Sequence, residues 1–292
     1  MSPRPRSQPF LLVFSLFAAL TAGGCATSKQ SPNSAPTSAS TTAPAAVMLP
    51  SAEAACPACR RIFDGKTWDG WEHEPETWSI TPDGAMRGFG KSPNGVRSAF
   101  TKTDHGDFRL IFTSRMAPQN KDHLGVLFWG PRPEAGSLKQ EKTVQVQPPH
   151  GAMWDYIENH NLPHEKLAPG SRDFESWHVT EVLGRLQTGT LRVAVDGVEI
   201  GRYQDKAPTR LHRGPIGMQK HGGGASEYKD IFLEIDPSED RLTTVPGSTA
   251  WVPAPTPDVP AAPATPAAPT TAAAAPAAVA IPAPPSPPPV AR

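Results

Sequence analysis

Hydrophobic and polar residues alternate with a period of two along much of the middle of the chain. Residues 108–115 (FRLIFTSR), 143–147 (TVQVQ), 177–182 (WHVTEV) and 190–195 (TLRVAV) follow this pattern. Successive side chains of a β-strand point to opposite faces of its sheet, so the alternation predicts half-buried strands. The continuous apolar run 124–129 (LGVLFW) is typical of a strand buried on both faces.

Turn residues separate these strands at short intervals. Asp196-Gly197 predicts a tight hairpin between residues 190–195 and 198–200, and a last strand is expected over 226–235. We find no convincing helical period over twelve residues. The sequence therefore predicts an all-β domain, a two-sheet sandwich or jelly roll, with Trp68, Trp71 and Trp78 packed at its start.

The same alternation assigns side chains to faces. The side chains expected to point inward are Val144 and Val146, Ile216 and Met218, Trp177 and Val179. Those expected on the non-core faces are Gln145 and Gln147, Gln219 and His221, His178 and Thr180. Amides match sugar hydroxyls as both donor and acceptor, and indole rings stack on sugar rings. Such a face is a candidate sugar site, and the alternative is an ordinary solvated sheet face.

The ends of the chain differ from the middle. Residues 1–25 read as a lipoprotein-type signal peptide, with Arg4 and Arg6, an apolar stretch and small residues before Cys25. In that interpretation Cys25 becomes the lipidated first residue of an exported protein, anchored in the cell envelope at the outer membrane or the periplasmic face. The alternative is ordinary cleavage without lipidation.

Low-complexity segments flank a single domain. Residues 26–55 are a Ser/Thr/Ala/Pro linker and residues 238–292 a Pro/Ala-rich tail, both expected to be disordered. Contact of the tail with the cell wall stays open, as does a merely structural envelope protein. The folded domain is expected over residues 56–237. Basic and acidic residues number 28 each without a basic cluster, which excludes electrostatic support for a nucleic-acid partner.

Cys56 and Cys59 form a C-x-x-C pair at the edge of the domain. A redox motif should lie where a strand meets a helix, and no helical pattern is nearby. A local disulfide is the simpler interpretation for an exported protein.

The order of motifs resembles that of the 3-keto-disaccharide hydrolase domain, a family with a concanavalin-like sandwich. The matching segments are Ile62 to Trp71, Trp78 with Asp83-Gly84, Asp107-Phe108, Gly125-Val126, Gln145-Val146-Gln147, Gly151 to Asp155, Trp177-His178, Asp196-Gly197 and Gly214 to His221. Two positions depart from the family pattern: Gln145 replaces a glutamate and His178 replaces an asparagine.

The resemblance implies a hydrolase that cleaves glycosidic bonds of 3-keto-glycosides by acid/base chemistry. A ketone at C3 makes the C2 hydrogen acidic, so the site needs a base, an oxyanion stabiliser and an acid. The candidate catalytic residues are His221 and Asp155. The candidate substrate-binding residues are Gln145, Gln147, Trp154, His178 and Gln219.

A glutamine cannot act as a base, so Gln145 keeps a second interpretation open, a carbohydrate-binding module without catalysis. No segment has convincing metal-ligand spacing, because Pro163 interrupts the His160–His164 pair. No metal ligands or cofactors are predicted, while a structural or catalytic divalent cation stays open.

Overall fold

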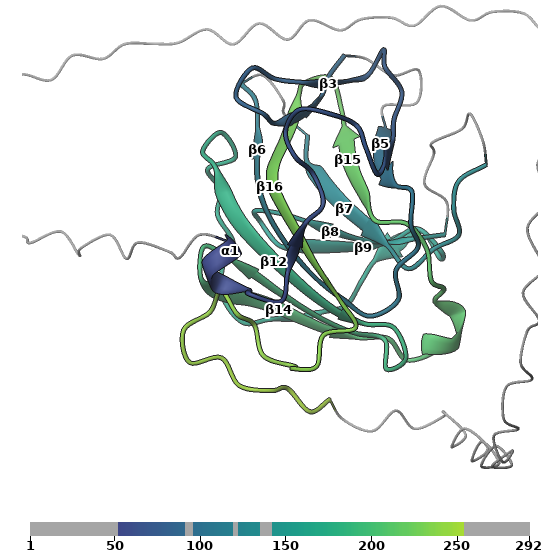
Figure 1. Ribbon diagram of the computed structural model, residues 1–292. Helices are drawn as coiled ribbons and strands as arrows, with labels where there is room; N and C mark the ends of the chain where they lie inside the picture. The colour runs from purple at the N-terminus through teal and green to yellow at the C-terminus, as the bar shows by residue number, and fades with distance from the viewer. Residues whose placement is uncertain (1–51, 91–95, 119–121, 135–141, 254–292) are drawn as a thin grey trace, which may run out of the picture. The chain divides into compact units, whose positions relative to one another are not determined.

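The computed structural model describes residues 52–90, 96–118, 122–134 and 142–253. Over these residues the chain forms two antiparallel sheets that face each other across one hydrophobic core (Figure 1). In this part of the chain one sheet has nine strands and the other seven, and the only helices are α1 (Ala52–Ala55) and the 3-10 turn η1 (Pro208–Arg210). The predicted all-β, two-sheet sandwich is confirmed.

The strand order in each sheet shows how distant segments meet. The larger sheet runs β11 (Glu165–Lys166), β14 (Val198–Gln204), β13 (Thr190–Val195), β12 (His178–Arg185), β6 (Phe108–Met116), β16 (Ser226–Ile235), β4 (Met86–Gly88) and β3 (Trp78–Ile80), with β1 (Arg60–Arg61) also on β16. The smaller sheet runs β10 (His160–Asn161), β9 (Ala152–Asp155), β8 (Val144–Gln147), β7 (Leu124–Phe128), β15 (Gly217–His221), β5 (Val96–Thr101) and β2 (Trp71–Glu72).

The smaller sheet turns the expected side chains toward the core. Val144 and Val146 of β8 and Met218 of β15 are buried in the main core cluster, as the alternation predicts. Lys220 shares the parity of Met218 and is buried against β4, where a Cβ on Gly88 would lie 2.7 Å from the Lys220 Cβ. The polar residues between them therefore lie on the outer face of this sheet.

The hairpin and the start of the domain also follow the sequence. Asp196 and Gly197 both have positive φ, 49° and 79°, as a type I′ turn between β13 and β14 requires. Trp71 and Trp78 are buried in the core, and Trp68 packs partly buried against it. Cys56 and Cys59 are joined by a disulfide, and Cys56 packs on the outer face of the larger sheet with apolar side chains of β6 and β16.

Strand β12 has the opposite orientation to the predicted one. Val182, which shares its parity with His178 and Thr180, lies in the main core, whereas Val179 packs on the outer side with Ile111 and Phe232. The expectation that Val179 points inward and His178 outward is therefore corrected. The orientation could not be read from the alternation because both faces of β12 are covered, so apolar residues occupy both faces.

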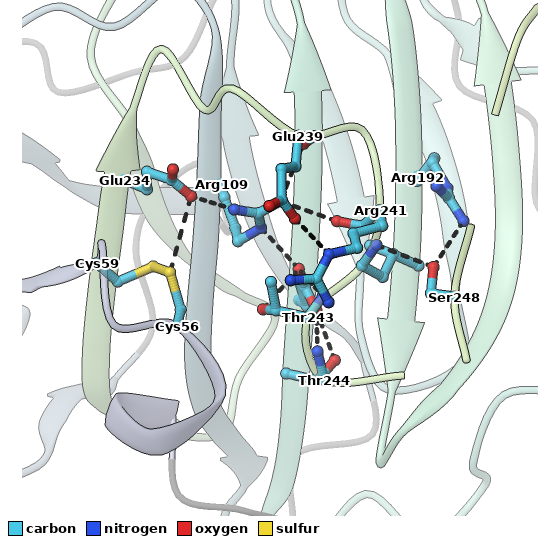
Figure 2. Close-up of polar contacts among 12 residues, drawn as sticks. Cys56, Cys59, Arg109, Arg192, Glu234, Glu239, Arg241, Thr243, Thr244 and Ser248 are labelled. Atoms are coloured by element: carbon cyan, nitrogen blue, oxygen red, sulfur yellow. Dashed lines mark hydrogen bonds and ion pairs between the residues drawn. A yellow bond between two sulfur atoms is a disulfide. The ribbon is translucent and has the colours of Figure 1, made fainter. Parts of the chain in front are cut away.

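Cys56 and Cys59 cover that outer face beside Val179, and a segment that we call the C-terminal strap, residues 236–253, covers it beside Leu183. Leu242 is fully buried with Leu183 of β12 and Ala194 of β13. Arg109 donates to the backbone oxygens of Glu239 (3.1 Å) and Arg241 (2.8 Å), as Figure 2 shows. The folded unit therefore continues past the predicted boundary at residue 237, because buried polar groups of the sheet bind the strap backbone.

Buried ionic groups fix the strap along its length. Glu181 accepts hydrogen bonds from the backbone nitrogens of Thr243 (2.9 Å) and Thr244 (2.7 Å), and from both threonine hydroxyls. Arg192 donates to the Thr249 carbonyl (2.8 Å) and to the Ser248 hydroxyl (3.1 Å; Figure 2). The outer face of the larger sheet is thus occupied by the chain itself.

Residues 1–51 and 254–292 lie outside the described residues, and with them the predicted signal peptide, Cys25, most of the linker and most of the tail. Among the helices that the structure describes, none has the length and apolar character needed to cross a bilayer.

Candidate functional site

Three glutamine side chains form a continuous row on the outer face of the smaller sheet. Gln147 Nε2 donates to Gln145 Oε1 at 2.7 Å, and Gln145 Nε2 donates to Gln219 Oε1. Gln219 Nε2 then donates to the Tyr156 hydroxyl at 3.3 Å. We call these four residues the amide row. Gln145 and Gln219 are fully buried, so the row is an ordered hydrogen-bonded structure rather than a set of mobile surface side chains.

A glycine on the strand between them allows the two central amides to meet. Gly125 of β7 lies beside Gln219 in the register, and a Cβ at this position would be 2.4 Å from Gln145 Nε2 and 2.6 Å from Gln219 Oε1. From the core side the Tyr228 hydroxyl of β16 donates to the Gly125 carbonyl at 3.0 Å. Desolvation by complete burial raises the pKa of Tyr228, so this hydroxyl stays neutral and holds the middle strand in place.

Two imidazoles and a carboxylate lie at one end of the row. His221 ends β15, and His123 immediately precedes β7 on the neighbouring strand. Their rings stack with centroids 4.2 Å apart and 18° between planes. Asp122 Oδ1 lies 2.7 Å from His221 Nδ1 and 3.3 Å from His123 Nδ1. His123 Nε2 lies 3.3 Å from Gln147 Nε2, which joins this group to the amide row.

Burial sets the protonation state of His123. Desolvation, together with the neighbouring His221, lowers the pKa of His123 to about 4, against the opposing effect of Asp122. His123 is therefore neutral near pH 7 and has one ring nitrogen available as an acceptor or ligand. The amide nitrogen of Gln147 facing Nε2 assigns that nitrogen as the acceptor.

Aromatic side chains flank the row. Trp154 is the cross-strand neighbour of Gln145, and its ring lies 6.3 Å from that of Tyr156. Within the described residues the buried Trp154 Nε1 has no hydrogen-bond partner. An indole beside amides provides a stacking surface next to hydrogen-bonding groups, which is what a sugar ring requires.

The structure does not bring Asp155 into this group. Asp155 follows Trp154 by one residue and so faces the core side of β9 with Met153. Its Oδ2 pairs with Arg210 at 2.7 Å, and its Oδ1 accepts from the backbone nitrogens of Ile157 and Glu158. Its carboxylate is engaged in holding the β9–β10 turn and η1.

His178 lies on the other sheet. Its Nδ1 is 2.6 Å from Asp196 Oδ2 beside the β13–β14 hairpin, and its Nε2 contacts the Asp173 carbonyl. The hydrogen bond with Asp196 is the main cause that raises the pKa of His178. The structure thus unites Gln145, Gln147, Gln219, Trp154 and His221, and separates them from Asp155 and His178.

Sequence reasoning missed Asp122 and His123. His123 has the same parity as Gly125, so the alternation could have placed it on the outer face of β7. What the alternation could not supply is that β7 lies between β8 and β15, which brings His123 against His221.

A family model described as the 3-keto-alpha-glucoside-1,2-lyase-like domain matches residues 58–234. The chain belongs to this family. The resemblance noted from its motifs is thereby confirmed, and family membership supports a carbohydrate-active function at this coarse level.

Solved structures that the chain resembles include a protein of unknown function with a galectin-like fold and a carbohydrate binding module, both from Bacillus subtilis. The first is 13% identical with a TM-score of 0.45, covering 57% of this chain and 90% of that one. The second is 14% identical with a TM-score of 0.43, covering 56% and 95%. A Bacillus licheniformis beta-glucanase is 13% identical with a TM-score of 0.40, covering 61% and 97%. No curated protein matches the chain.

Gln145 has a definite role at the position where the family pattern has a glutamate. Its amide donates to Gln219 and accepts from Gln147. A carboxylate can accept both bonds but donate neither. The centre of the amide row is therefore a group that both gives and receives a hydrogen bond.

Proposed function

We propose that the domain cleaves glycosidic bonds of 3-keto-glycosides. The observation that carries the proposal is the continuous polar row from Tyr156 through three glutamines to the imidazoles of His123 and His221. The amides and Trp154 offer hydrogen bonds and a stacking surface to the sugar. His221 and its neighbours are the groups in this row that suit chemistry at the reacting carbons.

The reaction that this arrangement suits is an elimination. A proton leaves C2, the negative charge passes to the C3 oxygen, and the bond from C1 to the glycosidic oxygen breaks. The leaving oxygen takes up a proton, and addition of water to the unsaturated sugar completes a net hydrolysis. The step needs a polar, partly buried reacting end, and His221 with Asp122 2.7 Å away fits this need.

Turnover of a 3-keto-glycoside tests the proposal. His221→Ala should lower the rate by about 10²–10⁴-fold, while binding of the sugar changes much less. His160→Ala is the matched control, because this exposed histidine lies outside the row. Trp154→Ala should instead weaken sugar binding. Full activity in His221→Ala would refute the assignment of the reacting end.

Gln145 specifically favours a second candidate, a carbohydrate-binding module that has lost catalysis. In that case the wild-type chain binds sugar without turnover, and Trp154→Ala still weakens binding. Gln145→Glu separates the two candidates: activity that appears only in this variant identifies a site that has lost its carboxylate.

We also propose that the protein is exported and anchored through a lipid on Cys25, which the character of residues 1–25 supports. Cys25→Ser should then move the protein from the membrane fraction to the soluble fraction. Unchanged membrane association would count against the anchor.

A further inference from the structure

Three donor atoms converge at the reacting end of the amide row. They are Asp122 Oδ1, His123 Nδ1 and His221 Nδ1, and the ligand atoms of this group all lie within 4.8 Å of one another. Ligands about 2.0–2.1 Å from a tetrahedral zinc ion are about 3.3–3.4 Å apart. The spacing of His123 Nδ1 to the carboxylate oxygen, 3.3 Å, matches that value, whereas the spacing of His221 Nδ1, 2.7 Å, is shorter and would widen when a cation enters.

The orientation of His221 gives a second argument. Its Nδ1 is buried and only 2.7 Å from Asp122 Oδ1, yet the two atoms are not aligned as a hydrogen bond. Within the described residues this nitrogen has no hydrogen-bond partner. A nitrogen and an oxygen that lie close without facing each other are arranged as two ligands of a third atom would be.

We propose that Asp122, His123 and His221 bind one divalent transition-metal cation. Two imidazoles and one carboxylate suit Zn²⁺, Mn²⁺ or Co²⁺, whereas Mg²⁺ and Ca²⁺ prefer oxygen ligands throughout. Three protein ligands leave at least one coordination position open, as in catalytic rather than structural metal sites.

The amide row provides the outer contacts that such a site needs. When His123 binds a cation through Nδ1, its Nε2 carries the proton and requires an acceptor. Gln147 Nε2 lies 3.3 Å from that Nε2. Rotation of the Gln147 amide group by half a turn places its oxygen there instead of its nitrogen. The same half turn in Gln145 and Gln219 keeps every bond of the row and makes Tyr156 a donor at its far end. The row thus accommodates His123 both with Nε2 as an acceptor and with Nε2 as a donor.

The cation would deepen the proposed function, and this part of the inference rests on it. Negative charge develops on the C3 oxygen when the C2 proton leaves, and a cation with an open position is a suitable partner for that oxygen. His221 then contributes to turnover as a ligand. Cation binding itself does not depend on the substrate.

Calorimetric titration of the full chain with Zn²⁺, after treatment with a chelator and dialysis, tests the inference. One equivalent should bind, and His123→Ala and Asp122→Asn should each weaken binding at least about tenfold. Co²⁺ should give a visible absorption band that both variants lose. His160→Ala is the control, because Asp155, Glu158 and His160 form another donor group in the described residues. Melting curves of all variants verify that they are folded.

The outcomes separate this inference from the proposed function. Stoichiometric Zn²⁺ binding that depends on His123 supports the cation site even when no 3-keto-glycoside is turned over. Absence of binding, or binding lost in His160→Ala and retained in folded His123→Ala, overturns the cation site. Turnover that persists in chelator without bound metal overturns the cation's role and leaves the proposed function standing.

Discussion

Arg109 joins the larger sheet to the C-terminal strap, and its replacement by methionine should strongly destabilise the domain. The side chain is 3% exposed, its Nε donates to the fully buried Glu181 at 3.0 Å, and it also pairs with Glu234. Methionine fills similar space without charge. Glu181 would keep its four bonds from Thr243 and Thr244 but lose its cation.

The magnitude follows from the burial of the pair. Removing one partner of a buried ion pair costs about 3–5 kcal/mol, because the other charge is left uncompensated. For a domain of this size such a loss lowers the melting midpoint by on the order of 10 °C. The stability of Arg109→Lys should lie between those of wild type and Arg109→Met. Lysine keeps the charge but lacks the planar set of donors that reaches two carboxylates and two carbonyls.

Urea unfolding followed by tryptophan fluorescence measures the effect. Arg241→Ala is the matched control, because its side chain is 53% exposed and, among the described residues, forms an ion pair only with the exposed Glu239, while its backbone carbonyl still accepts from Arg109. That control should lose about 0–1 kcal/mol. Equal losses in the two variants would refute the view that the strap is held by buried ionic contacts.

Three further predictions concern the strap, the amide row and the pH dependence of stability. A chain ending at residue 253 should have the melting midpoint of the full chain. A chain ending at residue 237 should have a midpoint lower by about 10 °C or more, because Leu242 and the strap partners of Arg109 and Arg192 are removed. Equal midpoints of the two shortened chains would contradict the packing of the strap. Gly125→Ala should weaken sugar binding about tenfold or more and lower stability by about 1–3 kcal/mol, since the new Cβ pushes apart the two buried, hydrogen-bonded amide ends of Gln145 and Gln219. Gly223→Ala, whose Cβ meets nothing within 4 Å, is its control, and an identical effect in both variants would count against the row. The pKa of His178 is raised above its ordinary 6.5 by its hydrogen bonds with Asp196 and the Asp173 carbonyl. The stability that protonated His178 contributes is therefore fully present below pH 6.5 and is lost as pH rises through the raised pKa. The difference in unfolding free energy between wild type and His178→Asn should shrink over that range, and a difference that is constant with pH would exclude the linkage.

The sequence predicted the sandwich, the disulfide and the faces of β8 and β15 because each depends on local pattern. It failed where a second layer intervenes. Val179 and His178 were given the wrong faces because the outer side of β12 is buried too, beside Val179 by the Cys56–Cys59 segment and beside Leu183 by the strap. Neither covering segment is local to that strand.

The candidate site shows the same limit. Gln145, Gln147 and Gln219 could be grouped from alternation within single strands, and the structure joins them. Asp155 was placed with them because it adjoins Trp154 in sequence, although one residue along a strand reverses the face. Asp122 and His123 were missed because their approach to His221 depends on the order of β8, β7 and β15.

The central position of β16 determines when the domain can be completed. The last strand lies between β6 and β4, and β1 pairs with it as well, so β1, β3 and β4 join the larger sheet only through residues 226–235. A chain that emerges from its N-terminus onward therefore holds its earliest strands without their partner until nearly the whole domain has been made. Such non-local pairing is slow, and it leaves strand edges exposed in the meantime. The early strands cannot take their place in the sheet until β16 has emerged, and the outer face stays uncovered until the strap follows it.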